Sequence, residues 1–176
     1  MKILNTKFKD LKIINGITFN DNRGSFRELY RNTFFKKKQL IFWSCSKSKK
    51  NVVRGLHLQT KFEQGKFISV VKGEIFDVAV DLRKNSKTYG KYFSIRLSEK
   101  NSNSIFIPGG FAHGFCSLKK ENLVFYGFTN YRSQIHEVGI LWNDPFIKVK
   151  WPVKKPIISS KDKNNITLKN FQNLYL

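Results

Sequence analysis

The chain has 176 residues, with 33 lysine and arginine residues against 12 aspartate and glutamate residues, a formal net charge of +21. Hydrophobic residues make up 40% and aromatic residues 15%, which excludes a disordered or fibrous chain and predicts one domain over residues 1–176. No apolar run approaches the ~20 residues of a membrane span, and we expect no signal peptide. Cys45 and Cys116 form no disulfide framework, so we expect a cytoplasmic protein.

The predicted elements are mainly short strands rich in Ile, Val, Phe and Tyr, separated by turn residues. In chain order the predicted strands are Gly16–Phe19, Leu40–Ser46, Val52–Leu58, Lys66–Val71, Ile75–Leu82, Lys91–Leu97, Ser104–Ile107, Gly114–Leu118, Leu123–Thr129 and Val138–Trp142. One short helix is predicted around Phe34–Gln39, and the apolar end of the Pro156–Leu176 tail is expected to dock on the barrel. Strands at ~8–12-residue spacing predict an all-β sandwich or barrel.

The positive charge comes mostly from lysines spread over the whole chain, with short clusters at residues 36–38, 47–50 and 148–155. Alanine is nearly absent while Lys, Asn, Ile and Phe are abundant, which indicates compositional drift rather than a specific partner. We find no groove-reading helix and no stacked-aromatic RNA signature. Nucleic acid is therefore not the expected partner, although a basic protein attracts polyanions non-specifically.

Residues Arg54–Gln59 are the first segment that could carry chemistry. Strand alternation places Arg54 on one face and His57 and Gln59 on the other, unless a bend at Gly55 breaks the alternation. A histidine and a glutamine that point into a small barrel need a ligand or an internal partner, because burying unpaired polar groups is costly.

The histidine count argues against a bound metal. The chain has only His57, His113 and His136, and Gln59 stands where small metal-binding β-barrels often have a second histidine. His113 follows a glycine-rich turn, whereas His136 lies in a polar segment beside Glu137. We therefore expect no metal and a site that works by proton transfer.

Taken together, several sequence blocks resemble the dTDP-4-dehydrorhamnose 3,5-epimerase family, a cupin-fold group that acts on nucleotide-linked 4-keto sugars. The blocks are Asp21–Glu28, Arg54–Gln59, Gln64–Lys66, Asp77–Arg83, Ile107–Phe115, Gly139–Pro145 and Ser160–Lys163. The resemblance implies a cupin-type jelly-roll barrel, a double-stranded β-helix. It also implies a cofactor-free homodimer that inverts C3, C5 or both of a nucleotide-diphospho-4-keto-6-deoxy sugar through an enolate. The expected pathway is deoxysugar and surface polysaccharide biosynthesis.

The family pattern also implies roles for individual residues. His57 would be the general base, oriented by Asp162, and Tyr126 would return a proton from the opposite face. Lys66, with His113 nearby, would stabilise the enolate oxygen. The implied substrate-binding residues are Arg54 and Lys161 for the diphosphate or sugar, Arg23, Phe26 and Glu28 for the nucleotide from the neighbouring subunit, and Ser44, Ser46, Gln59 and Glu137.

These residue types suit the chemistry without reference to the family. Removing a weakly acidic proton next to a ketone requires a base of near-neutral pKa, and histidine supplies it. A carboxylate on the second ring nitrogen supports the imidazolium, and a fixed cation such as Lys66 stabilises the enolate by roughly 3–4 kcal/mol. Inversion needs a second group on the other face, and Tyr126 qualifies.

The chain also departs from the family pattern. A common Gln-x-Asn-x-Ser run reads Phe42–Ser46 here, so only the serine is kept; Arg132 replaces a frequent tyrosine, and Leu58 a frequent aromatic residue. The nucleotide or the sugar could therefore differ from dTDP-rhamnose precursors. A 3,4-ketoisomerase and a single-centre epimerase share the enolate and stay open, as does, more distantly, a non-catalytic basic binding protein.

Overall fold

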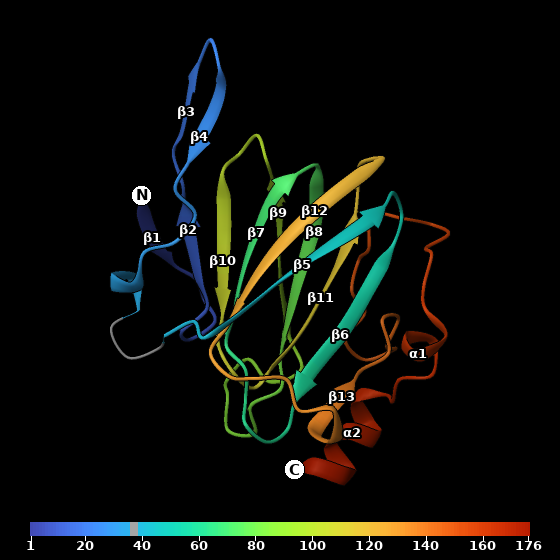
Figure 1. Ribbon diagram of the computed structural model, residues 1–176. Helices are drawn as coiled ribbons and strands as arrows, with labels where there is room; N and C mark the ends of the chain where they lie inside the picture. The colour runs from blue at the N-terminus through green and yellow to red at the C-terminus, as the bar shows by residue number, and fades with distance from the viewer. Residues whose placement is uncertain (36–38) are drawn as a thin grey trace.

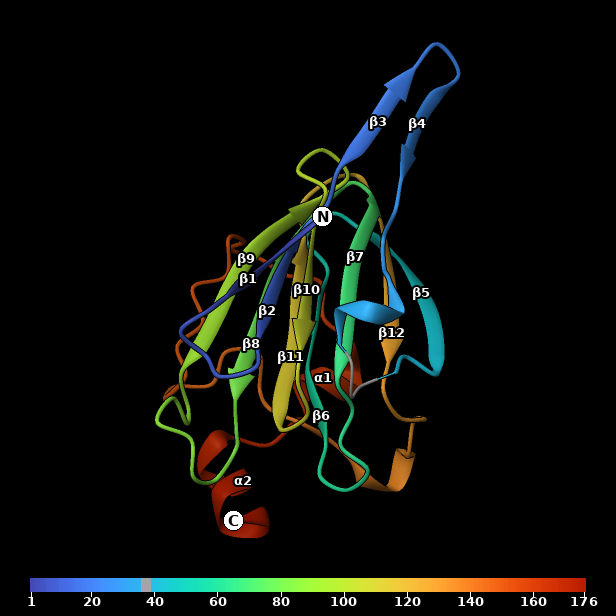
Figure 2. The same cartoon turned by 90° about the vertical axis from the view of Figure 1, so that its left-hand side faces the viewer.

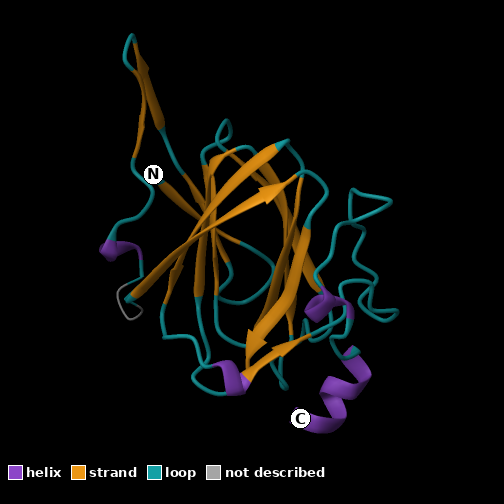
Figure 3. Ribbon diagram, turned by 45° about the vertical axis from the view of Figure 1, so that its right-hand side comes forward, coloured by secondary structure: helices purple, strands orange, loops and turns teal. Residues whose placement is uncertain are grey.

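A computed structural model of the chain describes residues 1–35 and 39–176. Two antiparallel β-sheets face each other (Figures 1 and 3). The first sheet has the order β1 (Lys2–Asn5), β2 (Lys12–Asn15), β10 (Asn103–Ile107), β7 (Lys66–Lys72), β12 (Glu121–Phe128) and β5 (Phe42–Lys49). The second has the order β13 (Glu137–Gly139), β6 (Val53–Gln59), β11 (Phe111–Ser117), β8 (Glu74–Asp81) and β9 (Tyr92–Ser98). This is the predicted all-β, cupin-type architecture.

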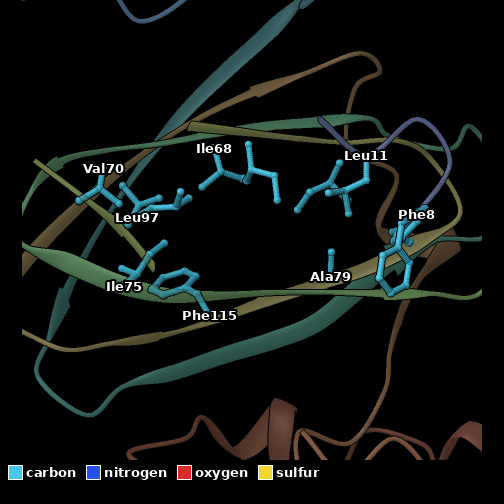
Figure 4. Close-up of a cluster of buried hydrophobic side chains, with 12 residues drawn as sticks. Phe8, Leu11, Ile68, Val70, Ile75, Ala79, Leu97 and Phe115 are labelled. Atoms are coloured by element: carbon cyan, nitrogen blue, oxygen red, sulfur yellow. The ribbon is translucent and has the colours of Figure 1, made fainter. Parts of the chain in front are cut away.

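The main core fills the space between the two sheets. Ile68 and Val70 of β7 point toward Ile75 of β8, Leu97 of β9 and Phe115 of β11, and all five side chains are buried (Figure 4). Phe8 and Leu11, from the loop between β1 and β2, close one end of this layer. Period-two alternation in the strands therefore produces the inner apolar face that the sandwich needs.

The predicted strands agree with the structure over most of the chain. The nine predicted segments from Leu40 to Trp142 correspond in order to β5 through β13. The predicted strand Gly16–Phe19 is β3 (Thr18–Asp21), which pairs with an unpredicted β4 (Gly24–Arg27). The strands β1 and β2 are also unpredicted, because strands of four residues with polar neighbours carry a weak periodic signal.

The helix predicted around Phe34–Gln39 lies partly outside the described residues, which do not include 36–38. At the start of this segment the structure has the end of a 3-10 helix, Asn32–Phe34. The α-helices of the described residues are in the C-terminal tail, as α1 (Ser160–Lys163) and α2 (Leu168–Tyr175). The predicted docking of this tail is confirmed, because the buried side chains of Leu168 and Phe171 pack on the outer face of the second sheet.

The β3–β4 hairpin projects away from the barrel (Figure 2). Phe19 and Phe26 lie opposite each other across its two strands and are 62% and 70% exposed. At its base the Arg27 guanidinium donates to the carbonyl oxygens of Val70 and Glu99, at 2.6 and 3.4 Å. The hairpin is thus anchored at its base and uncovered beyond it.

Among the described residues, no helix is long and apolar enough to cross a membrane.

Candidate active site

A pocket of about 800 Å³ lies between the edges of the two sheets. β5 and β12 of the first sheet form one wall, and β6 and β11 of the second sheet form the other. The pocket brings together most of the polar residues singled out in the sequence: Ser44, Arg54, His57, Lys66, His113, Tyr126, Glu137, Lys161 and Asp162.

A histidine–carboxylate pair occupies one wall. Asp162 Oδ1 lies 2.6 Å from His57 Nε2, and its Oδ2 accepts a longer hydrogen bond of 3.3 Å from the Gly55 amide. Burial alone would raise the pKa of Asp162, but the hydrogen bonds from His57, Gly55 and Ser159 lower it overall. An ionised carboxylate only accepts, so Nε2 carries the proton and His57 Nδ1 is left as the basic nitrogen.

The local course of β6 decides which residues share this wall. Strict alternation would place Arg54 and His57 on opposite faces, but both line the pocket, so the alternative of a break at Gly55 is the one that the structure has. His113 pairs with His57 and Phe115 with Arg54, so β6 has one residue more than β11 over this stretch. Such a bulge interrupts the alternation. Gly55 permits it, because its φ is +110° and a Cβ there would lie 2.6 Å from the Gly114 Cα.

Lys66 reaches the pocket from β7, in the first sheet. Its ammonium group donates a 2.8 Å hydrogen bond to the carbonyl oxygen of His57, which belongs to the second sheet. Burial lowers the pKa of Lys66 to about 8, although the negative charges of Glu137 and Asp77 act in the opposite direction. A buried cation beside the histidine is suited to stabilising an oxyanion.

His113 lies beside this group on β11. Its Nε2 is 2.8 Å from Asp77 Oδ2, and both side chains are buried. In the sequence, Asp77 belongs to a matched block but has no assigned role. The strand register sets Asp77 opposite Phe115 and therefore near His113. Only this register reveals Asp77 as the carboxylate that orients this histidine.

Tyr126 lies on the wall opposite His57, because β12 belongs to the first sheet and β6 to the second. Its hydroxyl oxygen is 2.9 Å from the hydroxyl oxygen of Ser46. Burial raises the pKa of Tyr126 above its ordinary value, so the phenol is protonated at neutral pH. The pocket therefore offers a base on one wall and a proton donor on the facing wall.

A second charged group lies at the side of the pocket. The Glu137 carboxylate accepts hydrogen bonds from Arg132, at 2.7 and 3.2 Å, and from the Lys161 ammonium. Burial would raise the pKa of Glu137, but these two cations lower it to about 2. In the sequence Arg132 stands out only as a departure from the family pattern, and the structure adds it to the pocket lining.

Five predicted residues lie outside the pocket lining. One of them, Ser46, bonds to the pocket residue Tyr126. Arg23 pairs with Asp21 at the tip of the hairpin, Phe26 is exposed on the same hairpin, and Glu28 pairs with Arg31. The amide of Gln59 donates to the Phe62 carbonyl at 2.8 Å and accepts from the Ser133 amide at 2.6 Å. Gln59 thus braces two loops in this chain, and ligand-binding roles for all five residues stay predictions.

Within residues 1–35 and 39–176, no group of three or more His, Cys, Asp and Glu side chains is arranged to hold a metal ion. Both histidines of the pocket are bonded to a carboxylate through Nε2. Such pairs set the tautomer of a histidine that moves a proton.

The fold is a cupin-type sandwich, and a histidine–aspartate pair faces a tyrosine across its pocket. These features define the class of protein: an enzyme suited to proton transfer. The family model described as dTDP-4-dehydrorhamnose 3,5-epimerase matches residues 5–170. The chain belongs to this family.

Individual relatives agree with that assignment. The dTDP-4-dehydrorhamnose 3,5-epimerase of Shigella flexneri is 42% identical over 170 residues, which cover 93% of this chain and 94% of the relative. That of Methanothermobacter thermautotrophicus is also 42% identical over 170 residues, with 93% and 92% covered. A Legionella pneumophila dTDP-6-deoxy-D-glucose-3,5-epimerase, solved in complex with dTDP-4-keto-L-rhamnose, superposes with a TM-score of 0.91 at 36% identity, covering 96% and 93%.

Proposed function

We propose that this protein is an isomerase of the dTDP-4-dehydrorhamnose 3,5-epimerase type, which inverts C3 and C5 of a dTDP-linked 4-keto-6-deoxy sugar in deoxysugar biosynthesis. The observation that carries the proposal is the placement of His57, with Asp162, and Tyr126 on facing walls of one pocket. The relatives named above support the substrate class. The free cysteines suit a cytoplasmic location, and we propose surface polysaccharides as the destination of the product.

The reaction follows from the positions of these groups. His57 Nδ1 removes the proton from the carbon next to the ketone, and Asp162 stabilises the imidazolium that forms. The electron pair moves onto the ketone oxygen, where Lys66 stabilises the enolate by roughly 3–4 kcal/mol. Tyr126 then protonates the carbon from the facing wall, which inverts the centre. No redox change occurs, and the proton on His57 returns through solvent to the tyrosine.

Cations are available for the diphosphate. Arg54 is held by its own hydrogen bonds, from Nε to the Ser48 hydroxyl at 3.0 Å and from Nη2 to the Lys47 carbonyl at 3.3 Å. A guanidinium fixed in this way suits phosphate oxygens because its remaining N–H donors keep a defined orientation. We assign the same task to Lys161, which also lines the pocket.

Solvent proton exchange tests the proposal. In deuterated water, incubation with dTDP-4-keto-6-deoxyglucose is expected to place deuterium at C3 and C5, as read by NMR. The His57→Ala variant should lose exchange but keep dTDP binding. His136→Ala is the matched control, because His136 bonds to Ser133 outside the pocket, and it should retain exchange. No incorporation by folded, unsubstituted protein would rule the proposal out.

A single-centre epimerase is the second candidate. A relative from Streptomyces niveus named dTDP-4-dehydrorhamnose 3-epimerase is 31% identical, covering 84% of this chain and 74% of the relative. Deuterium at C3 alone would select that reaction. A product with the carbonyl moved to C3 would select the ketoisomerase.

We also infer a homodimer in which the β3–β4 hairpin contributes to the neighbouring subunit's site. An isolated two-stranded ribbon is marginally stable in water, and this one exposes the Phe19–Phe26 pair. Its tip carries Arg23, which suits an anionic nucleotide. Burial against a second copy would cover the two phenyl rings and bring Arg23, Phe26 and Glu28 to a ligand.

Mixing two inactive variants tests this arrangement. Phe26→Ser and His57→Ala homodimers are each expected to be inactive, whereas their mixed dimer has one site with an intact hairpin and an intact base. Activity should return to on the order of a quarter of the unsubstituted level after subunit exchange. Phe146→Ser, another exposed phenylalanine at 65%, is the control and should stay active alone. A monomer by sedimentation velocity, or no recovery on mixing, would contradict the arrangement.

A further inference from the structure

Lysines from three separate turns converge on a groove at one end of the barrel. The groove has a volume of about 1210 Å³ and lies at the end opposite α2 (Figure 1). The turns follow β5, follow β7 and precede β12, and are far apart in the sequence. The lysines that line the groove are Lys47, Lys49, Lys50, Lys72, Lys119 and Lys120.

Nearby carboxylates neutralise only part of this charge. Glu121 bridges Lys47 and Lys72, at 2.7 and 2.6 Å, and these two lysines lower the pKa of Glu121 to about 2. Glu99 is the other acidic residue of the lining. In the part of the chain that the structure describes, Lys49, Lys50 and Lys120 form no ion pair and are exposed. The groove therefore keeps a net positive charge.

The groove adjoins the active-site pocket. Ile157 lines both, and β5 contributes Phe42 and Ser44 to the pocket and Lys47 and Ser48 to the groove. Lys47 and Ser48 accept the hydrogen bonds of Arg54, which lines the pocket. Arg54 is therefore in contact with both the groove lining and the pocket.

We propose that this lysine groove is an electrostatic entry surface that concentrates the nucleotide diphosphate of the substrate and speeds its transfer to Arg54. The inference rests on the proposed function and deepens it. Clustered charge of one sign raises the association rate of an opposite ligand by 10- to 10³-fold, and salt screens the effect over a Debye length of about 10 Å at 0.1 M. The groove acts on association and leaves the chemical step unchanged.

Stopped-flow binding of the fluorescent nucleotide mant-dTDP tests the proposal. In a Lys49→Glu, Lys50→Glu, Lys120→Glu variant, the association rate at low salt should fall about 5- to 10-fold, with a flatter dependence on salt. The dissociation rate should change little, and kcat at saturating substrate should stay the same. The matched control, Lys87→Glu, Lys91→Glu, Lys169→Glu, changes the net charge equally on exposed lysines near the opposite end of the barrel, and should keep most of the association rate.

Three results would overturn the inference and leave the proposed function standing. Equal association rates and salt slopes for the groove variant and the unsubstituted protein would remove the groove from substrate entry. An equal loss in the control variant would assign the effect to overall charge. A groove variant that loses binding to a single-stranded DNA oligomer, with mant-dTDP association unchanged, would reassign the groove to polyanions. If the unsubstituted protein does not bind mant-dTDP, both the inference and the proposed function fail. This result is therefore distinguishable from a failure of the inference alone.

Discussion

Lys66 is a residue at which the requirements of catalysis and of stability oppose each other. Burial disfavours its charged form and lowers its pKa to about 8, yet the enolate needs a positively charged donor. The protonated fraction therefore falls as the pH rises through about 8. Activity should decline on the alkaline side of that value, well before an exposed lysine would titrate at about 10.4.

Lys66→Met should accordingly lower activity and raise stability. The folded-state pKa is below the unfolded value, so the unfolded protein binds more protons between about pH 8 and 10.5, and stability rises with pH there. Methionine removes that penalty but also the hydrogen bond to the His57 carbonyl, worth about 1 kcal/mol. Urea unfolding at pH 7 should give a net gain of about 2 kcal/mol that narrows toward pH 10, with kcat reduced about 10²- to 10³-fold. Lys91→Met is the control at an exposed lysine. If Lys66→Met and the unsubstituted protein were equally stable at pH 7, this account would be contradicted.

At the scale of elements, the short helix α1 holds Asp162, the carboxylate bonded to the proposed base His57. Ser159 caps it: the serine hydroxyl accepts a 3.1 Å hydrogen bond from the Asp162 amide. α2 begins in the same way, because the Thr167 hydroxyl accepts from the Asn170 amide at 3.1 Å. The two caps are chemically equivalent, but only the first bonds to a residue of the pocket.

This pair of caps separates positioning from stability. Ser159→Ala and Thr167→Ala should each lower the free energy of unfolding by about 1 kcal/mol, through the loss of an N-cap. Only Ser159→Ala should also reduce kcat, by roughly 10-fold, because Asp162 loses its restraint. In the Ser159→Ala variant, the apparent pKa of the base in the pH profile of kcat should shift, while KM stays nearly constant. Equal kcat values for the two variants would show that the first cap is merely structural.

The strand register explains how much of the site the sequence could reveal. The family resemblance predicts the four proposed acid–base residues of the site, and the strand patterns predict the order of the strands that carry three of them. The sequence left the face of Arg54 open, because strict alternation and a break at Gly55 give different answers, and an extra residue in β6 decides between them. Asp77 and Ser46 acquire their partners, His113 and Tyr126, only across strands that are distant in the sequence.

At the scale of the whole molecule, the net charge of +21 has a thermodynamic consequence apart from any site. Lysines on one surface repel one another more in the compact folded state than in the expanded unfolded chain. Added salt screens that repulsion. The melting temperature at pH 7 should therefore rise between about 10 and 200 mM NaCl, by a few degrees in differential scanning calorimetry. A melting temperature that falls with salt would mean that attractive ion pairs, such as those of Glu121, outweigh the repulsion.

The sequence by itself determined the all-β class and ten strands in order, because these depend on local alternation, and its resemblance to the family indicated the acid–base residues. Tertiary structure alone decided which lysines act together, since Lys49, Lys72 and Lys120 become neighbours only when three turns meet at one end of the barrel. It also decided the pairing of His113 with Asp77, 36 residues apart. Contacts of this kind arise from the closure of long loops and the packing of sheets, and no local pattern in the chain encodes them.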